Sequence, residues 1–274
     1  MQRSQLVKTT GVLLGLAIAL PIPPFSLPVT ARSVSSQARL KESRPRGDWG
    51  GPHTGAGTAT DSRGGCPAVT HPLTALMPTS NWGTTLAERP TLWFYMPYTP
   101  DQISVGKFVL QDLEGTDIVE PLAFRLPNTP GFVSVTLPES VPVLELDQEY
   151  RWYFELYCNS PDTVPVEVNG WIQRQPLTPA LEAQLSATPR PDQVYASERI
   201  WYDAIAHLLS QIRENPDSAT LEANLAALLA DGGIGLLPEV LSTPAIVGEV
   251  IFLEGVFSET TTENSPIESQ PPGR

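Results

Sequence analysis

The ten residues EYRWYFELYC, at positions 149–158, restrict the fold more than any other stretch of this sequence. Successive side chains of a strand point to opposite faces, so Tyr150 and every second residue as far as Cys158 share one apolar face. Arg151 and Glu155 fall on the other face. The segment therefore predicts a strand with one face in a hydrophobic core and with Cys158 on that face.

Short runs of β-type residues fill the chain up to about residue 175, and turns containing Pro or Gly separate them. The predicted strands are residues 91–97, 106–113, 117–124, 131–137, 149–158 and 164–174. No stretch of helical period separates them, which favours an antiparallel sandwich over a parallel sheet. The segment LELDQEYRW also resembles the tyrosine corner of immunoglobulin-like sandwiches, in which a tyrosine bonds back across the preceding turn. We predict an antiparallel immunoglobulin-like β-sandwich over residues 66–175.

The apolar period changes to that of a helix after Arg174. A helix over about residues 192–214 would place Trp201 and other apolar side chains on a single stripe. Capping and helix-breaking residues mark the ends of the predicted helices. The first helix begins at Thr178-Pro179, and the second ends at Asn215-Pro216. The third is capped by Asp217 or Ser218 and ends at Gly232-Gly233. We predict a helical subdomain over residues 176–256, with a C-terminal helical hairpin, packed against the sandwich.

The N-terminus has the pattern of an export signal. Arg3 and Lys8 precede a short apolar run from Gly11 to Leu20, and small residues allow cleavage after Ala31. We expect residues 1–31 to be a signal peptide and the mature chain to have no membrane span, with an uncleaved anchor as the alternative. Export predicts a periplasmic or secreted protein.

The two segments that flank the folded part are polar. Residues 32–65 are rich in Gly, Ser, Arg and Pro, and residues 257–274 are polar and Pro-rich, so we expect a disordered linker and a disordered tail. From Gly64 onward, nine basic residues face twenty-seven acidic ones. A body this acidic disfavours nucleic acid and anionic membrane surfaces as partners.

The chain has two cysteines, Cys66 and Cys158. In an oxidising compartment this number predicts one disulfide bond between them. Two unrelated buried thiols are the alternative.

No motif for catalysis or for a cofactor occurs in the sequence. The histidines, His53, His71 and His207, lie far apart and have no Cys, His or carboxylate at the spacing of metal ligands. A nucleophile elbow and a phosphate loop are both missing. We therefore expect no catalytic residue, no metal site and no cofactor.

The aromatic segment TLWFYMPY, residues 91–98, allows two interpretations. As a core strand, it buries the Phe94 face against the opposing sheet and the Trp93 face beneath the helices. As a ligand platform, it presents Trp93 and Tyr95, with Trp171 from a later strand, to a sugar. The core strand is our preferred interpretation, because the helices need a partner for their Trp201 stripe.

An ordered series of motifs resembles a known family: GGCP…LTALMP (64–78), ERPTLWFYMPY, FVLQD, YRWYFELYC, GWIQR (170–174) and IWYDAIAHL (200–208). This series is similar to the cyanobacterial family called domain of unknown function 928 over roughly residues 64–237. The resemblance implies a secreted cyanobacterial protein and assigns no activity, catalytic residue or ligand.

These observations favour an exported, non-enzymatic binding or scaffolding module, whose partner is a protein of the periplasm or cell envelope. The first alternative is a carbohydrate-binding module that binds polysaccharide through exposed Trp and Tyr side chains. The second is a hydrolase of unrecognised type, which requires a pocket where carboxylates with shifted pKa values converge.

Overall fold

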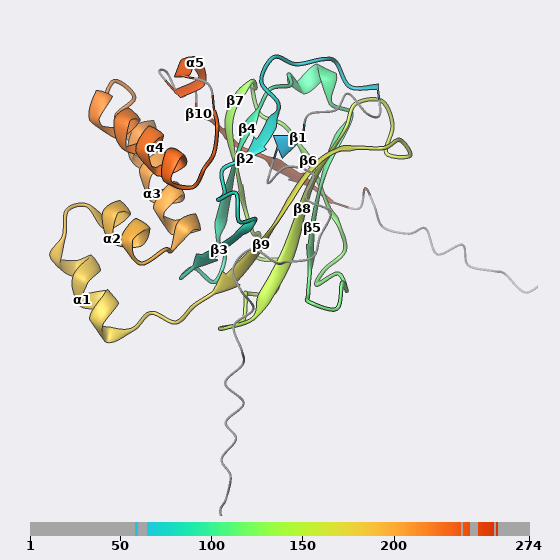
Figure 1. Ribbon diagram of the computed structural model, residues 1–274. Coiled ribbons are helices and arrows are strands. Elements are labelled where there is room, and N and C mark those ends of the chain that lie inside the picture. The colour runs from blue at the N-terminus through green and yellow to red at the C-terminus, as the bar shows by residue number, and fades with distance from the viewer. Residues whose placement is uncertain (1–57, 60–64, 237, 242–245, 255, 257–274) are drawn as a thin grey trace, which may run out of the picture. The chain divides into compact units, whose positions relative to one another are not determined.

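Two β-sheets and a group of helices make up the folded part of the chain (Figure 1). The computed structural model describes residues 58–59, 65–236, 238–241, 246–254 and 256, all within one unit that extends from Arg44 to Arg274. The predicted signal peptide, nearly all of the predicted linker and the predicted tail lie outside these residues. Within the described ranges, no helix is both long and apolar enough to cross a membrane.

The first sheet has the strand order β1-β2-β4-β7-β10 and the second has the order β11-β6-β5-β8-β9-β3. The strands of the first sheet are β1 (Thr58–Ala59), β2 (Leu73–Ala75), β4 (Thr91–Met96), β7 (Gly131–Thr136) and β10 (Ile246–Glu249). The strands of the second sheet are β3 (Trp82–Thr85), β5 (Val105–Gln111), β6 (Leu122–Arg125), β8 (Glu149–Tyr157), β9 (Val166–Arg174) and β11 (Ile251–Leu253). A short 3-10 helix, Pro100–Gln102, precedes β5.

Each predicted strand corresponds to an observed one, although β6 occupies only the last part of the predicted segment 117–124. The sandwich-like arrangement is confirmed, but the expectation of purely antiparallel sheets was wrong. β3 pairs in parallel with β9, and β10 pairs in parallel with β7. Both parallel strands are edge strands that arrive through long connections, so no hairpin pattern marked them in the sequence.

The helices are α1 (Pro179–Ala187), α2 (Pro191–Ser197), α3 (Trp201–Glu214), α4 (Ala219–Asp231) and α5 (Pro238–Leu241). The predicted caps are confirmed at two starts, where the side chains of Thr178 and Ser218 accept hydrogen bonds from the backbone N–H groups of Leu181 and Leu221. α4 ends at Asp231, just before the Gly232-Gly233 pair, as predicted.

The single helix predicted over 192–214 was wrong, because Arg199 interrupts it. Arg199 has a φ of 62° and its N–H donates to the carbonyl of Ala196, while the N–H of Ile200 donates to that of Tyr195. This is the Schellman geometry of a helix end, in which the left-handed residue is usually glycine. The sequence has arginine at this position, so the usual signal for a helix end is missing.

The core lies between the sheets and contains the apolar face of β8 predicted from the sequence. The Phe94 ring of β4 stacks on the Phe154 ring of β8, with centroids 4.2 Å apart, and meets the Trp152 ring edge-on at 5.6 Å. The other face of β4 is also covered, because Trp93 is only 5% exposed and α3 packs against β4. β4 is therefore a central strand buried on both faces, as the preferred interpretation expects.

Helix α3 is attached to both sheets by buried side-chain hydrogen bonds. The Trp201 Nε1–H donates to the carbonyl of Leu76, next to β2, at 2.8 Å. The Trp152 Nε1–H of β8 donates to the Tyr202 hydroxyl at 2.8 Å, and this hydroxyl donates to the carbonyl of Trp171 at 3.1 Å. Burial raises the pKa of Tyr202, so the hydroxyl stays protonated and available as a donor.

The residues after α5 differ from the predicted helical subdomain, because they complete the sheets instead. β10 joins the first sheet beside β7, and β11 joins the second sheet beside β6. Only Val250 separates these two strands, and its N–H donates to the carbonyl of Ser134. The chain therefore crosses from one sheet to the other within a few residues.

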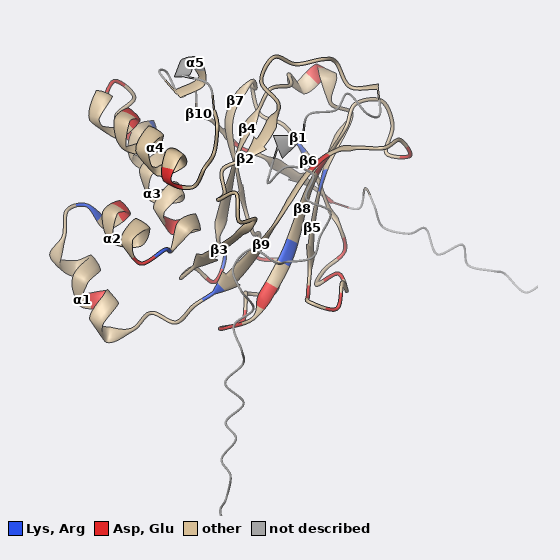
Figure 2. Cartoon of the chain, in the orientation of Figure 1, with Lys and Arg blue, Asp and Glu red and all other residues tan. Residues whose placement is uncertain are grey.

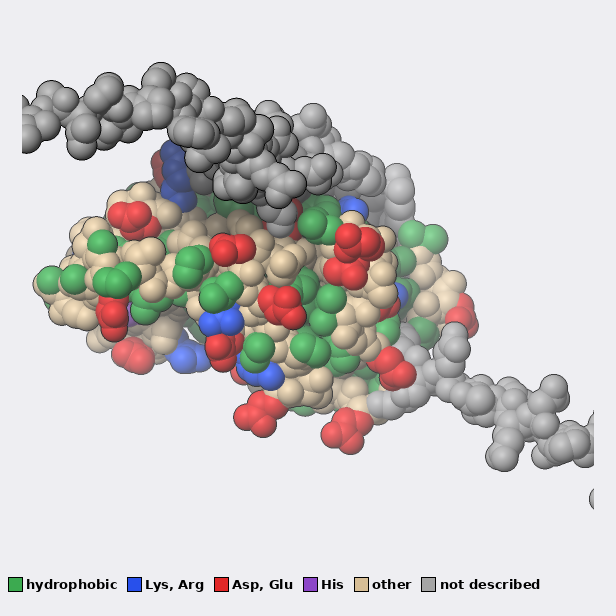
Figure 3. All heavy atoms as spheres, turned by 90° about the horizontal axis from the view of Figure 1, so that it is seen from below, with side chains coloured by type: hydrophobic (Ala, Val, Ile, Leu, Met, Phe, Trp, Pro, Cys, Tyr) green, Lys and Arg blue, Asp and Glu red, His purple; other side chains and the backbone are tan. Residues whose placement is uncertain are grey.

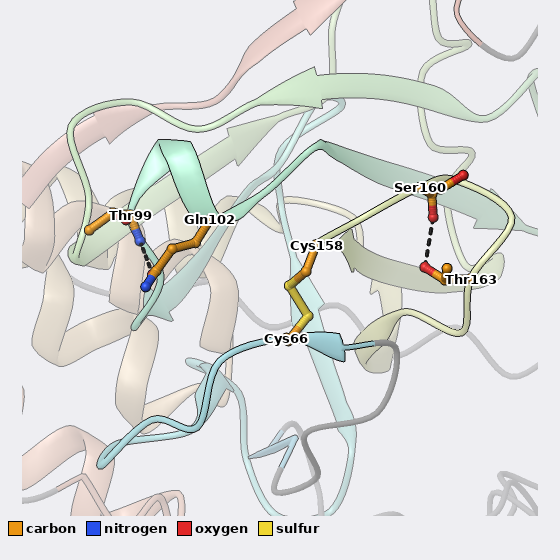
Figure 4. Close-up of a disulfide and its surroundings, with 6 residues drawn as sticks. All are labelled: Cys66, Thr99, Gln102, Cys158, Ser160 and Thr163. Carbon is orange, nitrogen blue, oxygen red and sulfur yellow. Dashed lines mark hydrogen bonds between the residues drawn. A yellow bond between two sulfur atoms is a disulfide. The ribbon is translucent and has the colours of Figure 1, made fainter.

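The predicted disulfide is confirmed between Cys66 and Cys158 (Figure 4). The Cα atoms lie 5.2 Å apart, within the range that a disulfide bond spans. Cys66 precedes β2 of the first sheet and Cys158 directly follows β8 of the second, so the bond ties the two sheets together.

Removing this disulfide should destabilise the fold substantially. The bond closes a separation of 92 residues, for which the chain-entropy model gives about 4–5 kcal/mol. We expect the Cys66→Ser/Cys158→Ser variant to lose a free energy of unfolding of this order, measured by urea denaturation. Dithiothreitol should destabilise the wild type to the same extent and leave the variant unchanged. Equal stability of the oxidised wild type and the variant would contradict this assignment.

Truncation of either face of β4 should cost stability. We expect Phe94→Ala and Trp93→Ala each to lower the free energy of unfolding by about 3–5 kcal/mol, as large-to-small core substitutions do. Val164→Ala is the control, because Val164 is 61% exposed. If Trp93→Ala instead leaves the melting temperature unchanged and abolishes binding to a polysaccharide, the strand is a ligand platform.

The bond between Trp152 and Tyr202 can be tested by removing one oxygen atom. Tyr202→Phe leaves the buried Trp152 N–H without its acceptor, so we expect a loss of about 1–3 kcal/mol in the free energy of unfolding. Tyr195→Phe, on the partly exposed side of α2, is the matched control and should change it by less than about 0.5 kcal/mol. A Tyr202→Phe protein as stable as the wild type would show that the bond contributes nothing.

Candidate binding surface beside β3

The structure separates the three aromatic residues of the predicted platform. Trp93 and Tyr95 lie on β4 of the first sheet, whereas Trp171 lies on β9 of the second. Trp93 is buried, and the half-buried Tyr95 ring meets the rings of His71 and Phe132 edge-on. These three side chains therefore do not form one platform.

Trp171 has different aromatic neighbours, which come from the strands on either side of β9. The register places it opposite Trp82 of β3 and opposite Arg151 of β8. Opposite residues of paired strands share a face, and Tyr153 lies on that face two positions beyond Arg151. We call Trp82, Trp171 and Tyr153, which are all half-buried, the aromatic row.

Arg151 connects two members of the aromatic row. Its guanidinium carbon lies 4.7 Å from the centre of the Tyr153 ring and 5.6 Å from the centre of the Trp171 ring. Both distances allow cation–π attraction. Its Nη2 also donates to Asn169 Oδ1 at 3.1 Å, and Asn169 Nδ2 donates to Glu167 Oε1 at 3.2 Å. Arg151 therefore holds the Tyr153 ring, the Trp171 ring and the Asn169 amide in fixed positions relative to one another.

A second polar group lies farther along the same face of the sheet. Glu155 Oε2 lies 2.6 Å from Lys107 Nζ and accepts a hydrogen bond of 2.5 Å from the Tyr157 hydroxyl. Burial and then the hydrogen bond to Glu155 raise the pKa of Tyr157. Burial opposes the charge on Lys107, but bonding to Glu155 and Tyr157 outweighs it and raises the lysine pKa. At neutral pH this group is an ion pair with a neutral phenol.

Glu167 lies directly opposite Glu155 in the register of β8 and β9. Desolvation and then the negative charge of Glu155 raise the pKa of Glu167, while Asn169 and Arg151 oppose this. Lys107 and Arg151 thus balance two carboxylates on this face. Figure 2 shows basic and acidic segments next to each other along β8, and Figure 3 shows charges of both signs dispersed among hydrophobic groups on the face seen from below.

A cavity of about 440 Å³ opens beside Trp82, at the β3 end of the aromatic row. We call it the β3 cavity. Its lining includes two tryptophans, Trp82 and the buried Trp201, and two exposed charged residues, Arg199 and Asp231. Two serines also line it. This volume lies within the range of small-ligand sites, and the lining is more polar than is usual for them.

Unusual backbone conformations shape the walls of the β3 cavity. Arg199 is held in the left-handed region by the end of α2, and the Thr84 hydroxyl of β3 donates to its carbonyl at 2.9 Å. Gly232 lies against the Trp201 ring, where an added Cβ would come within 2.3 Å of it. A non-glycine residue in the left-handed region costs free energy, and such residues concentrate at functional sites.

A half-buried carboxylate positions α3 beside the cavity. Asp203 Oδ2 accepts the backbone N–H of Leu86, just after β3, at 3.1 Å. Burial raises the pKa of Asp203, while its hydrogen bonds with Thr85 and Leu86 oppose this. Asp203 serves as a link between α3 and the second sheet.

Of the residues at this surface, the sequence indicates Trp171 but neither Trp82 nor Arg199. Trp82 was overlooked because β3 has only four residues and pairs in parallel, far along the chain from β9. For Arg199, the predicted continuous helix concealed the left-handed turn. The segment NWGTT, residues 81–85, was the available signal, since a tryptophan beside glycine in a short extended run is compatible with an edge strand.

The predicted histidines do not gather at this site. His71 lies near Tyr95 and His207 near Tyr195, and His53 lies outside the described residues. Within the part of the chain that the structure describes, no group of three or more His, Cys, Asp and Glu side chains is placed to hold a metal ion.

Comparison with known proteins gives one match. The family described as Domain of Unknown Function (DUF928) matches residues 58–243, which include both sheets except β10 and β11, and all the helices. No curated protein and no solved structure gave a significant match. Because the family match covers more than half of the chain, this protein belongs to the DUF928 family.

Proposed function

We propose that this protein is an exported, non-enzymatic binding module that holds a small polar ligand, or one end of a larger one, in the β3 cavity. The observation that carries the proposal is the cavity itself, where Trp82 and Trp201 offer apolar faces beside Arg199 and Asp231. A ligand with one apolar face and several hydroxyl groups would find a partner for each of these groups.

The disulfide supports the export part of the proposal. A bond such as Cys66–Cys158 forms and persists in oxidising compartments, which include the periplasm and the extracellular space. Export also agrees with the signal peptide that the sequence predicts over residues 1–31.

The finer fold description is part of the same proposal: an immunoglobulin-like topology with a C-terminal helical hairpin. The Tyr150 hydroxyl accepts the backbone N–H of Glu145 at 3.1 Å, the kind of contact that defines a tyrosine corner. α3 packs against α4, which supports the hairpin.

The strained conformation of Arg199 supports binding as the role of the β3 cavity. Glycine at position 199 would keep the left-handed turn without the steric cost of a Cβ atom. Arginine here costs stability, and it places an exposed cationic residue in the cavity lining. We regard this as an exchange of stability for binding.

Replacing Arg199 should therefore affect stability and binding in opposite directions. We expect Arg199→Gly to raise the free energy of unfolding by about 1 kcal/mol, because the left-handed strain is relieved. The same variant should weaken ligand binding about tenfold or more. Binding is measured by tryptophan fluorescence and calorimetry with four probes: glucose, glucuronate, tyrosine and spermidine.

Two controls separate strain from the loss of the side chain. Asn81→Gly relieves a left-handed residue at φ 56° outside the cavity lining, so it should leave binding unchanged. Arg213→Ala removes an exposed arginine of α3 at a distance from the cavity. If no probe binds the wild type, or if Arg199→Gly binds a probe as tightly as the wild type does, the proposal is overturned.

A further inference from the structure

The aromatic row and the β3 cavity share Trp82, so the two features form one continuous surface. The row runs from Tyr153 of β8 across Trp171 of β9 to Trp82 of β3. Neighbouring strands lie about 4.8 Å apart, so this path extends roughly 10 Å before it reaches the cavity. A ligand on this surface is therefore longer than the cavity alone would accommodate.

The chemistry of the row favours a ligand with flat apolar faces and many hydroxyl groups. Aromatic rings supply apolar area for stacking, and the polar groups beside them supply donors and acceptors in the plane of the sheet. Arg151, Asn169 and Glu167 provide these groups, already linked to one another by hydrogen bonds. A sugar ring matches this pattern, with C–H groups on its face and hydroxyls at its edge.

The charges of the surface favour a neutral ligand. Lys107 is paired with Glu155, Arg151 is linked through Asn169 to Glu167, and Glu149 of β8 lies on the same face, so cations are not in excess there. The chain as a whole has a net charge of −13, which opposes polyanions. A phosphate- or sulfate-rich polymer would thus meet unfavourable long-range electrostatics and no excess of cations.

We propose that the aromatic row, together with the β3 cavity, binds a neutral oligosaccharide chain, with sugar rings stacked along Tyr153, Trp171 and Trp82 and one chain end in the cavity. The inference rests on the proposed binding function and names its ligand class. It also gives Arg151 a role, which is to hold the Tyr153 and Trp171 rings in position for stacking.

The test measures binding of the full chain to maltohexaose, cellohexaose and chitohexaose by calorimetry, and to the parent polysaccharides by affinity electrophoresis. We expect at least one series to bind. Trp171→Ala and Tyr153→Ala should each weaken that binding about tenfold or more, and Trp171→Phe should retain part of it because a ring remains. Tyr195→Ala, outside the row, should bind as the wild type does.

Folding of each variant is checked by its melting temperature, and saturation-transfer NMR on the wild type identifies contacted sugar protons without any substitution. Failure of all three series to bind the wild type overturns the inference and leaves the probes of the cavity as a separate test. Binding that responds to Arg199→Gly but not to Trp171→Ala or Tyr153→Ala also overturns it, with the cavity function intact. If light scattering shows that Trp171→Ala only dissociates an oligomer, the row is a contact between copies.

Discussion

The hydrogen bond from Trp152 to Tyr202 is the contact on which the site depends, because it fixes the first turn of α3 against the second sheet. The same hydroxyl continues to the Trp171 carbonyl, and the neighbouring Trp201 indole is anchored to Leu76 beside the first sheet. Trp201 and Tyr202 therefore each combine a large apolar area with a buried polar group that needs a hydrogen-bond partner. Once they are placed, the Trp201 ring forms one wall of the β3 cavity, and Trp82 forms another. The hydrogen bonds of Asp203 with Leu86 and of Thr84 with Arg199 also hold the helices beside β3.

Sequence periodicity predicted the strands of the central core well, because each has a buried face that dictates its pattern. β4 and β8 are the clearest cases, since Phe94 and Phe154 meet between the sheets. Caps and glycines were equally informative at α1 and α4, where local hydrogen bonds decide the helix end. β1, β2, β3, β10 and β11 were missed, because strands of two to four residues carry too few alternations to reveal a period, and β1 falls in the segment predicted as a disordered linker. Their positions come from tertiary pairing.

The candidate site was less predictable than the fold, because it forms where segments distant in the chain meet. Trp171 lies opposite Trp82, which precedes it by almost ninety residues, and Arg199 reaches the same edge from the end of α2. No spacing rule connects these positions. Arginine at position 199, where a helix end usually has glycine, is informative in itself. Residues that break such a local rule are often found at functional sites. Of the three residues of the predicted platform, Trp171 lies in the aromatic row, Trp93 belongs to the core and Tyr95 lies at its edge.

The switch of the chain from one sheet to the other at Val250 sets a condition on when folding can finish. β10 closes the edge of the first sheet at β7, and β11 closes the edge of the second at β6. Both edges stay open until residues 246–253 have emerged, so a nascent chain that lacks them exposes two unpaired strands at once. The pairing of β10 and β11 therefore determines when both sheets are complete.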